Sequence, residues 1–371
     1  MEVIMKRKIG VLLTLFVVFI FSAACSSEEE TDQSTEASYA QGMKKEPYTQ
    51  EEFLLGTYTR IRVFDEDKED VLQPAFDRIK ELEDKITINQ SGSEIDEINE
   101  NAGKKPVKVS KDIYDLLKQA RDYSKESDGG FNLMIGAITQ LWRIGFDDAR
   151  KPSQDEIDEA LKHVDYNDIA FDDDEQTVYL EDEDAIIDLG AIAKGYIADE
   201  AVAVLKEHEV ESAIVDLGGN IYVVGHSNRG ENVDWTVGIQ DPNDERGSVL
   251  GSIKESDKTI VTSGIYERYL EVDGETYHHL FDSETGYPYD NDIASATVIT
   301  DKSIDGDGLT TVIFDKGVKD GLKYIEDNTP EGTSAVFVTK EDKVYMTEDI
   351  EDSFELDEDS GYSLGDRSKL Q

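Results

Sequence analysis

Apolar residues follow two periods along the chain, one typical of strands and one typical of helices, and the two are interleaved without strict alternation. Short apolar or alternating runs predict strands at 57–64, 186–189, 212–217, 221–225 and 295–299. Apolar spacing of three and four residues predicts helices at 71–86, 110–127 and 193–207, with another from about Leu309. The pattern therefore predicts an α+β fold of mixed sheets flanked by helices, arranged in one or two lobes.

Local signals refine this outline at three places. Ser153 and Glu156 have the spacing of a capping box, which predicts a helix beginning there. Asp273-Gly274 predicts a hairpin over 269–280. The runs 334–339 and 343–347 predict a second hairpin near the end of the chain.

The first 24 residues have the pattern of a secretory signal peptide. Basic residues at 6–8 precede an apolar run over 9–21, which is shorter than the roughly 20 residues of a membrane-spanning helix. The following Ser-Ala-Ala-Cys resembles a bacterial lipobox, in which the cysteine is lipidated. We therefore expect Cys25, the only cysteine, to anchor an extracytoplasmic protein to the cell membrane by lipid alone. A buried structural cysteine is the alternative.

Composition divides the rest of the chain into three parts. Residues 25–47 are rich in Ser, Glu, Thr and Gln, which predicts a disordered tether. We expect the folded domain to cover 48–356 and a polar C-terminal tail to cover 357–371.

The chain of 371 residues carries a formal net charge of −47, from 84 acidic and 37 basic residues. A nucleic acid partner is excluded, because phosphate backbones require a basic surface. Most of the acidity is interpreted as a solvated surface. A site for an anionic ligand on such a surface must use a metal ion, backbone N–H groups or isolated cations.

The segment Asp188–Tyr196 has glycine at a predicted strand end that opens a helix. Such a turn collects free N–H groups and the positive end of the helix dipole, and Lys194 adds a point charge suited to phosphate. Neither a P-loop nor a dinucleotide fingerprint is present. A plain strand-to-helix turn is the alternative.

The segment Asp305–Thr311 places Asp307 and Thr311 four residues apart, and therefore on one helix face. A carboxylate and a hydroxyl are hard oxygen ligands that suit Mg²⁺. A capped helix with an acidic first turn is the alternative. In 278–288, His279 follows a predicted strand and is a candidate general base, with an ordinary strand-end histidine as the alternative.

Taken together and in this order, these segments resemble the ApbE family of FAD:protein FMN transferases. The resemblance covers roughly 53–356, and it is carried by 55–57, 131–145, DLGAIAKGYIAD (188–199), DLGGNI (216–221), VTSGIYERY (261–269), 279–288 and 295–314. It implies an ApbE-type fold and FAD as the substrate.

The resemblance also implies roles for individual residues. Mg²⁺ would be held by the carbonyl of Ala191 with Asp307 and Thr311, while His279 and Asp307 would be catalytic. The FAD contacts would be Leu55, Asn89, Trp142, Asp188, Lys194 and Phe281.

The implied reaction attaches FMN through a phosphoester to a Ser or Thr of an extracytoplasmic electron-transfer protein and releases AMP. The acceptor would carry a Ser/Thr-Gly-Ala-Ser/Thr type of sequence. Asn89 stands where many members have an aromatic residue, and Ser283 replaces a proline. Entry of water would turn the reaction into FAD hydrolysis to FMN and AMP, so a Mg-dependent FAD pyrophosphatase is one alternative. A non-catalytic flavin-binding lipoprotein is another.

Overall fold

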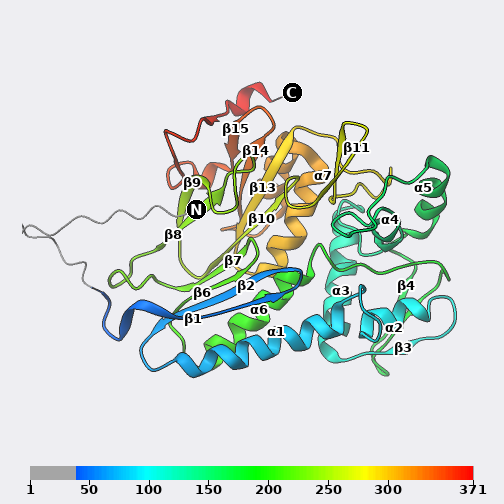
Figure 1. Ribbon diagram of the computed structural model, residues 1–371, viewed down its shortest axis with the longest axis horizontal. Helices are drawn as coiled ribbons and strands as arrows, with labels where there is room; N and C mark the ends of the chain where they lie inside the picture. Colours follow the sequence, from blue (N-terminus) through cyan, green and yellow to red (C-terminus); the bar gives the residue numbers. More distant parts are fainter. Residues whose placement is uncertain (1–38, 371) are drawn as a thin grey trace, which may run out of the picture. The chain divides into compact units, whose positions relative to one another are not determined.

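A nine-stranded sheet forms the centre of the fold in the computed structural model, which describes residues 39–370 (Figure 1). All neighbouring strands in it are antiparallel except the last pair, which is parallel. Its order is β1 (Met43–Leu54), β2 (Thr57–Asp65), β6 (Ser212–Leu217), β7 (Asn220–Gly225), β10 (Lys258–Gly264), β13 (Ile293–Thr300), β14 (Ser334–Thr339), β15 (Lys343–Met346) and β17 (Ser363–Leu364).

Three small sheets accompany the central one. They comprise β3 (Val107–Lys108), β5 (Thr177–Leu180) and β4 (Ile169–Asp172); β16 (Glu355–Leu356), β9 (Val249–Glu255) and β8 (Trp235–Gln240); and the hairpin β11 (Tyr269–Val272) with β12 (Glu275–His278). The helices are α1 (Leu72–Ile86), α2 (Glu94–Glu100), α3 (Lys111–Glu126), α4 (Gly136–Trp142), α5 (Gln154–Ala160), α6 (Ala193–Glu207) and α7 (Ser303–Asn328).

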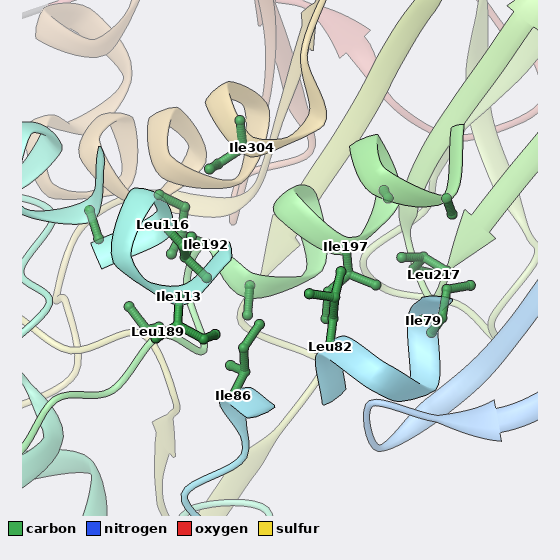
Figure 2. Close-up of a cluster of buried hydrophobic side chains, with 14 of the residues drawn as sticks. Ile79, Leu82, Ile86, Ile113, Leu116, Leu189, Ile192, Ile197, Leu217 and Ile304 are labelled. Carbon is green, nitrogen blue, oxygen red and sulfur yellow. The ribbon is translucent and has the colours of Figure 1, made fainter. Parts of the chain in front are cut away.

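Apolar side chains from α1 and α6 pack on one face of the central sheet. Figure 2 shows Ile79 and Leu82 of α1 beside Ile197 of α6 and Leu217 of β6. Burial of these side chains supplies most of the driving force for docking the helices. Further along the same sheet, α7 packs against β13 and β14.

The opposite face of the central sheet is covered by the small β8–β9–β16 sheet. Trp235, Val237 and Ile239 of β8 are buried against residues of β7, β10, β13 and β14. From β2 the buried part of this second core takes only Phe64, and from β1 only the partly buried Met43 packs against it.

The helices predicted from apolar periodicity are confirmed as α1, α3 and α6, and Ser153 forms the predicted capping box at the start of α5. The final helix begins at Ser303, earlier than the predicted Leu309. Both predicted hairpins are present. None of the helices among residues 39–370 is both long and apolar enough to cross a bilayer.

Three predictions are wrong. Residues 186–189 form no strand, because their backbone bonds to the loop before α4: Gly136 N donates to Ile186 O at 3.1 Å and Asp188 N to Leu133 O at 2.9 Å. The predicted tether ends too late, since β1 begins at Met43 and pairs with β2. Residues 357–370 are not a free tail, since β17 pairs with β15.

Two further predictions concern the domain limits. The predicted signal peptide, Cys25 and residues 25–38 of the predicted tether lie outside the described residues. The described residues belong to one compact unit, so a division into two lobes is not seen within them.

Candidate functional site

The contact between α6 and α7 joins the two segments that the sequence singles out. The N–H of Gly195, in the first turn of α6, donates to Asp307 Oδ2 of α7 at 2.5 Å. A Cβ at position 195 would lie 2.2 Å from the carbonyl oxygen of Ser303, so only glycine allows this close approach. The glycine-bearing turn and the predicted metal ligand Asp307 are therefore side by side.

Asp307 is a buried carboxyl group with only 4% of its surface exposed. Burial raises its pKa, and the charge of Lys194, the Gly195 N–H and the Asn220 amide offset part of that rise. The Asn220 amide nitrogen lies close enough to Asp307 to lower its pKa. Within the described residues this nitrogen forms no hydrogen bond of good geometry. A bound cation would stabilise the charged form of Asp307 further.

The Ala191 carbonyl is open to a ligand. In a regular helix it would accept from the N–H four residues later, at Gly195, but that N–H donates to Asp307. The Ala191 carbonyl accepts no backbone hydrogen bond from any other residue in 39–370. Thr311, one helical turn after Asp307, is half-buried, and its hydroxyl has no hydrogen-bond partner among the described residues. Among the predicted metal ligands, the Ala191 carbonyl and the Thr311 hydroxyl thus have no partner within the described residues, while Asp307 accepts from the Gly195 N–H.

Asp199 fixes the start of α7. Its two carboxylate oxygens accept from Ser303 N at 2.8 Å and from Ile304 N at 3.0 Å. The N-cap residue of α7, Lys302, provides no side-chain hydrogen bond, so a carboxylate from α6 satisfies these N–H groups instead. The Ser303 hydroxyl in turn donates to Asn220 Oδ1 and lies 2.9 Å from Thr259 Oγ1.

His279 follows β12 and is held by the loop that carries Arg268. The His279 N–H donates to the Arg268 carbonyl at 3.2 Å, and Nδ1 lies 3.2 Å from the same oxygen. Burial, followed by the charges of Arg268 and Lys194, lowers the pKa of His279 to about 3, with Arg268 the larger of the two charge effects. The ring is therefore neutral at ordinary pH, and Nδ1–H donation assigns the free lone pair to Nε2.

Arg268 itself is exposed, and its side chain crosses two glycines with positive φ. A Cβ at Gly56 would lie 3.2 Å from Nη2, and one at Gly145 would lie 2.9 Å from Cδ. Its guanidinium forms no ion pair with the residues that the structure describes. An isolated cation of this kind is what a phosphate site on an acidic protein would use.

Leu55 and Asn89 both lie near the C-terminal end of α1. Leu55 and Gly56 form the tight turn between β1 and β2, with φ of 56° and 70°, and Leu55 N donates to Glu83 Oε1 at 2.7 Å. Asn89 is exposed beyond the end of α1, with its N–H 3.3 Å from Thr87 Oγ1.

Asp188 is held on both carboxylate oxygens. Oδ2 accepts from Thr139 Oγ1 at 2.6 Å, and Oδ1 accepts from Gly190 N at 2.8 Å. It therefore links α4 to the turn that opens α6.

Trp142 and Phe281 belong to a small separate core. Trp142 is fully buried, its Nε1 donates to Gly286 O at 2.9 Å, and its ring packs on Phe281 at 5.7 Å between centroids. Phe281 is 8% exposed. Trp142 is thus buried in the interior with Phe281 packed on its ring. A direct contact between Trp142 and FAD stays a prediction.

A second group of possible metal ligands lies elsewhere among the described residues. Ligand atoms of His163, Asp182 and Asp184 come within 4.8 Å of one another. His163 Nδ1 already lies 2.6 Å from Asp182 Oδ2, which an ordinary ion pair explains.

The structure thus brings Ala191, Lys194 and Asp307 together, with His279 within range of the Lys194 charge. Sequence reasoning assigned no role to Asp199, Asn220 or Arg268. Each of the three lies inside a motif that carried the resemblance, but only the spatial contacts show what it does.

The chain as a whole is similar to proteins of known family. The ApbE family profile matches residues 55–337. A Klebsiella pneumoniae protein named FAD:protein FMN transferase is 36% identical over 300 residues, covering 81% of this chain and 92% of its own length. A Treponema pallidum protein of the same name is 33% identical over 320 residues, covering 82% and 88%.

Solved structures show the same architecture. The ApbE protein of Thermotoga maritima superposes with a TM-score of 0.75 at 31% identity, covering 82% of this chain and 98% of its own. The apo flavinyl transferase ApbE of Pseudomonas stutzeri gives a TM-score of 0.71 at 23% identity, covering 82% and 96%, and shows the fold alone. The predicted α+β fold of ApbE type is confirmed.

Proposed function

Because this chain belongs to the ApbE family, we propose that it is a Mg²⁺-dependent FAD:protein FMN transferase. The curated relatives at 36% and 33% identity bear that transferase name and match over most of the chain. The observation that carries the proposal is the buried contact between Asp307 of α7 and the Gly195 N–H of α6.

The donor set suits Mg²⁺. Asp307 supplies a carboxylate, Ala191 a carbonyl diverted from its helical partner, and Thr311 a hydroxyl one turn after Asp307. These are the hard oxygen ligands that Mg²⁺ prefers, with substrate phosphates and water completing its shell. When bound, the ion would neutralise negative charge on the FAD pyrophosphate.

In this proposal His279 receives the proton of the attacking hydroxyl. Its neutral ring, with Nδ1 directed at the Arg268 carbonyl, leaves Nε2 as the proton acceptor. The acceptor oxygen forms a bond to the FMN phosphorus while the bond from that phosphorus to the AMP phosphate oxygen breaks. The products are a phosphoester-linked flavin and AMP, and Lys194 and Arg268 offer positive charge to the anionic groups.

The acceptor and the location remain parts of this proposal. We propose an extracytoplasmic acceptor with a Ser/Thr-Gly-Ala-Ser/Thr type of sequence, and a lipid anchor on Cys25. The proposal for Cys25 rests on the lipobox pattern, which lies outside residues 39–370.

Asn89 favours a second candidate function, FAD hydrolysis. It is exposed and carries a short polar side chain where many members of the family carry an aromatic ring. Such a position excludes less water from the flavin site, and water competes with the acceptor hydroxyl for the phosphorus.

A product assay separates the possible functions. With FAD, Mg²⁺ and an acceptor, transfer gives AMP and protein-bound flavin fluorescence, while hydrolysis gives AMP and free FMN. We expect Asp307→Ala to abolish AMP release, because a ligand of the essential cation is lost.

The matched control is Asp320→Asn, which neutralises an exposed carboxylate on the same helix and should leave turnover unchanged. Full AMP release by Asp307→Ala would show that the metal assignment is wrong. Absence of AMP from the unmodified protein would leave flavin binding as its only activity.

A further inference from the structure

A groove lies where the small β8–β9–β16 sheet stops covering the central sheet. It has a volume of about 540 Å³, and its lining includes Tyr58 and Arg60 of β2, Asp216 of β6, Gln240 of β8, Arg246 and Tyr266. We call it the β8 groove. The transferase proposed above requires a place for its second substrate, and none of the predicted FAD contacts lines this groove.

The β8 groove adjoins the candidate catalytic histidine through one short segment. Tyr266 and Glu267 line the groove, and the next residue, Arg268, holds His279 through its carbonyl at 3.2 Å. On the same side, Arg246 Nη1 donates to Thr57 Oγ1 at 3.3 Å, directly after the Leu55-Gly56 turn. A ligand lying in the groove would therefore reach the FAD site from the side opposite α6.

One wall of the groove belongs to an edge strand. Within the described residues β8 pairs only with β9, so the backbone groups along its other edge have no strand partner. Gly238 and Gln240 of β8 line the groove. An extended polypeptide can satisfy such an edge by adding a strand, which gives affinity largely independent of side chains.

The mouth of the groove carries apolar side chains on an otherwise highly charged surface. Tyr58 is 62% exposed and Val249 is 47% exposed, and both line the groove. The ring of Phe53, itself 66% exposed, meets Tyr58 edge to face at 5.6 Å between centroids. Exposed aromatic anchors beside an open strand edge are typical of a surface that binds polypeptide.

We propose that the β8 groove binds the acceptor protein as an extended segment along the free edge of β8, with the receiving hydroxyl presented at His279. This inference rests on the proposed transferase function. Tyr58 contributes an apolar contact and Arg246 a polar one, and neither residue is among the predicted FAD contacts.

The test compares two groove variants, Tyr58→Ala and Arg246→Glu, with two controls. Leu364→Ala removes an equally exposed apolar side chain, 60% exposed, at the opposite edge of the sheet. Arg229→Glu makes the same charge change in an exposed loop outside the groove. The acceptor used is a small soluble domain ending in a Ser/Thr-Gly-Ala-Ser/Thr segment.

Each groove variant is expected to raise the KM for the acceptor about tenfold or more, a loss typical of one interface anchor. FAD affinity and the slow release of AMP without acceptor should not change. The controls should match the unmodified enzyme in every measurement. Addition of the acceptor should also slow hydrogen exchange at β8 amides, which a purely structural role for Tyr58 or Arg246 would not produce.

Two outcomes would overturn the inference in distinguishable ways. Unchanged acceptor KM in both groove variants, with normal transfer by the unmodified enzyme, places the acceptor elsewhere and leaves the transferase function intact. Absence of flavin transfer by the unmodified enzyme removes the transferase function, and the inference about the groove with it.

Discussion

At the scale of single residues, His279 owes its protonation state to its neighbours. Burial and the charges of Arg268 and Lys194 lower its pKa to about 3, so the neutral ring persists far below the usual histidine range. A base with a lowered pKa stays unprotonated down to that lower pH, at the cost of a weaker affinity for the proton it accepts. Arg268 therefore contributes to the pH dependence, after the larger effect of burial.

Replacement of Arg268 by methionine should shift the acidic limb of the kcat/KM profile to higher pH. Loss of the positive charge lets the pKa of His279 rise toward its usual value, so the neutral base disappears earlier as pH falls. Arg150→Met is the control, because Arg150 pairs with Glu156 at the surface. An unchanged profile, with an unchanged NMR titration of His279, would contradict the role given to Arg268.

At the scale of elements, α7 depends on a carboxylate that α6 provides. Asp199 accepts from the first N–H groups of α7 and so sets the position of Asp307 and Thr311. Removing a side-chain cap of this kind costs about 1 to 2 kcal/mol of stability. The two helices thus act as one support for the candidate cation site.

Burial raises the pKa of Asp199 to about 6, above its unfolded value of 3.8. The shift adds to the free energy of unfolding. This contribution has its full value below pH 3.8 and is lost as the pH rises through about 6. Asparagine does not titrate in this range, so Asp199→Asn lacks this pH dependence. The difference in free energy of unfolding between the unmodified protein and Asp199→Asn should therefore decrease as the pH rises from 4 to 7. Urea denaturation at several pH values measures this difference, and a constant difference across that range would refute the assignment.

Elements with a clear apolar period or a turn signal were predictable, whereas a polar edge strand and an apolar loop were misread. The helices α1, α3 and α6 carry wide apolar faces. The strand β1 reads MKKEPYTQEEFL, whose polarity suits an exposed sheet edge and gives little strand signal. In 186–189, Ile187 and Leu189 are buried as in a strand, although the backbone of the segment bonds to a loop.

The candidate site was predictable in part for the same reason. Helical spacing placed Asp307 and Thr311 on one face, and the glycine turn marked the start of α6. The capping role of Asp199 depends on packing between distant segments, which no local pattern encodes. Arg268 and His279 instead lie opposite each other at the end of the predicted β11–β12 hairpin, although the sequence does not show what their contact does.

At the scale of the whole molecule, a net charge of −47 destabilises the folded state through self-repulsion. Sodium chloride should therefore raise the melting temperature by screening. At equal ionic strength, MgCl₂ should raise it further in the unmodified protein, because a specifically bound cation stabilises the folded state.

That additional increase should be absent in Asp307→Ala, whereas the response to NaCl should be the same in both proteins. Thermal denaturation in the two salts distinguishes the effects. An equal magnesium response in Asp307→Ala would assign the extra stabilisation to other carboxylates.

The strands β1 and β17 lie at opposite edges of the nine-stranded sheet. With eight inter-strand steps of about 4.8 Å, the two edges are separated by roughly 4 nm. Attachment to a bead or sensor surface through the C-terminal edge would thus leave the β1 side, including the β8 groove, facing the solution. Immobilised enzyme in this orientation would suit flow-through labelling of proteins with flavin.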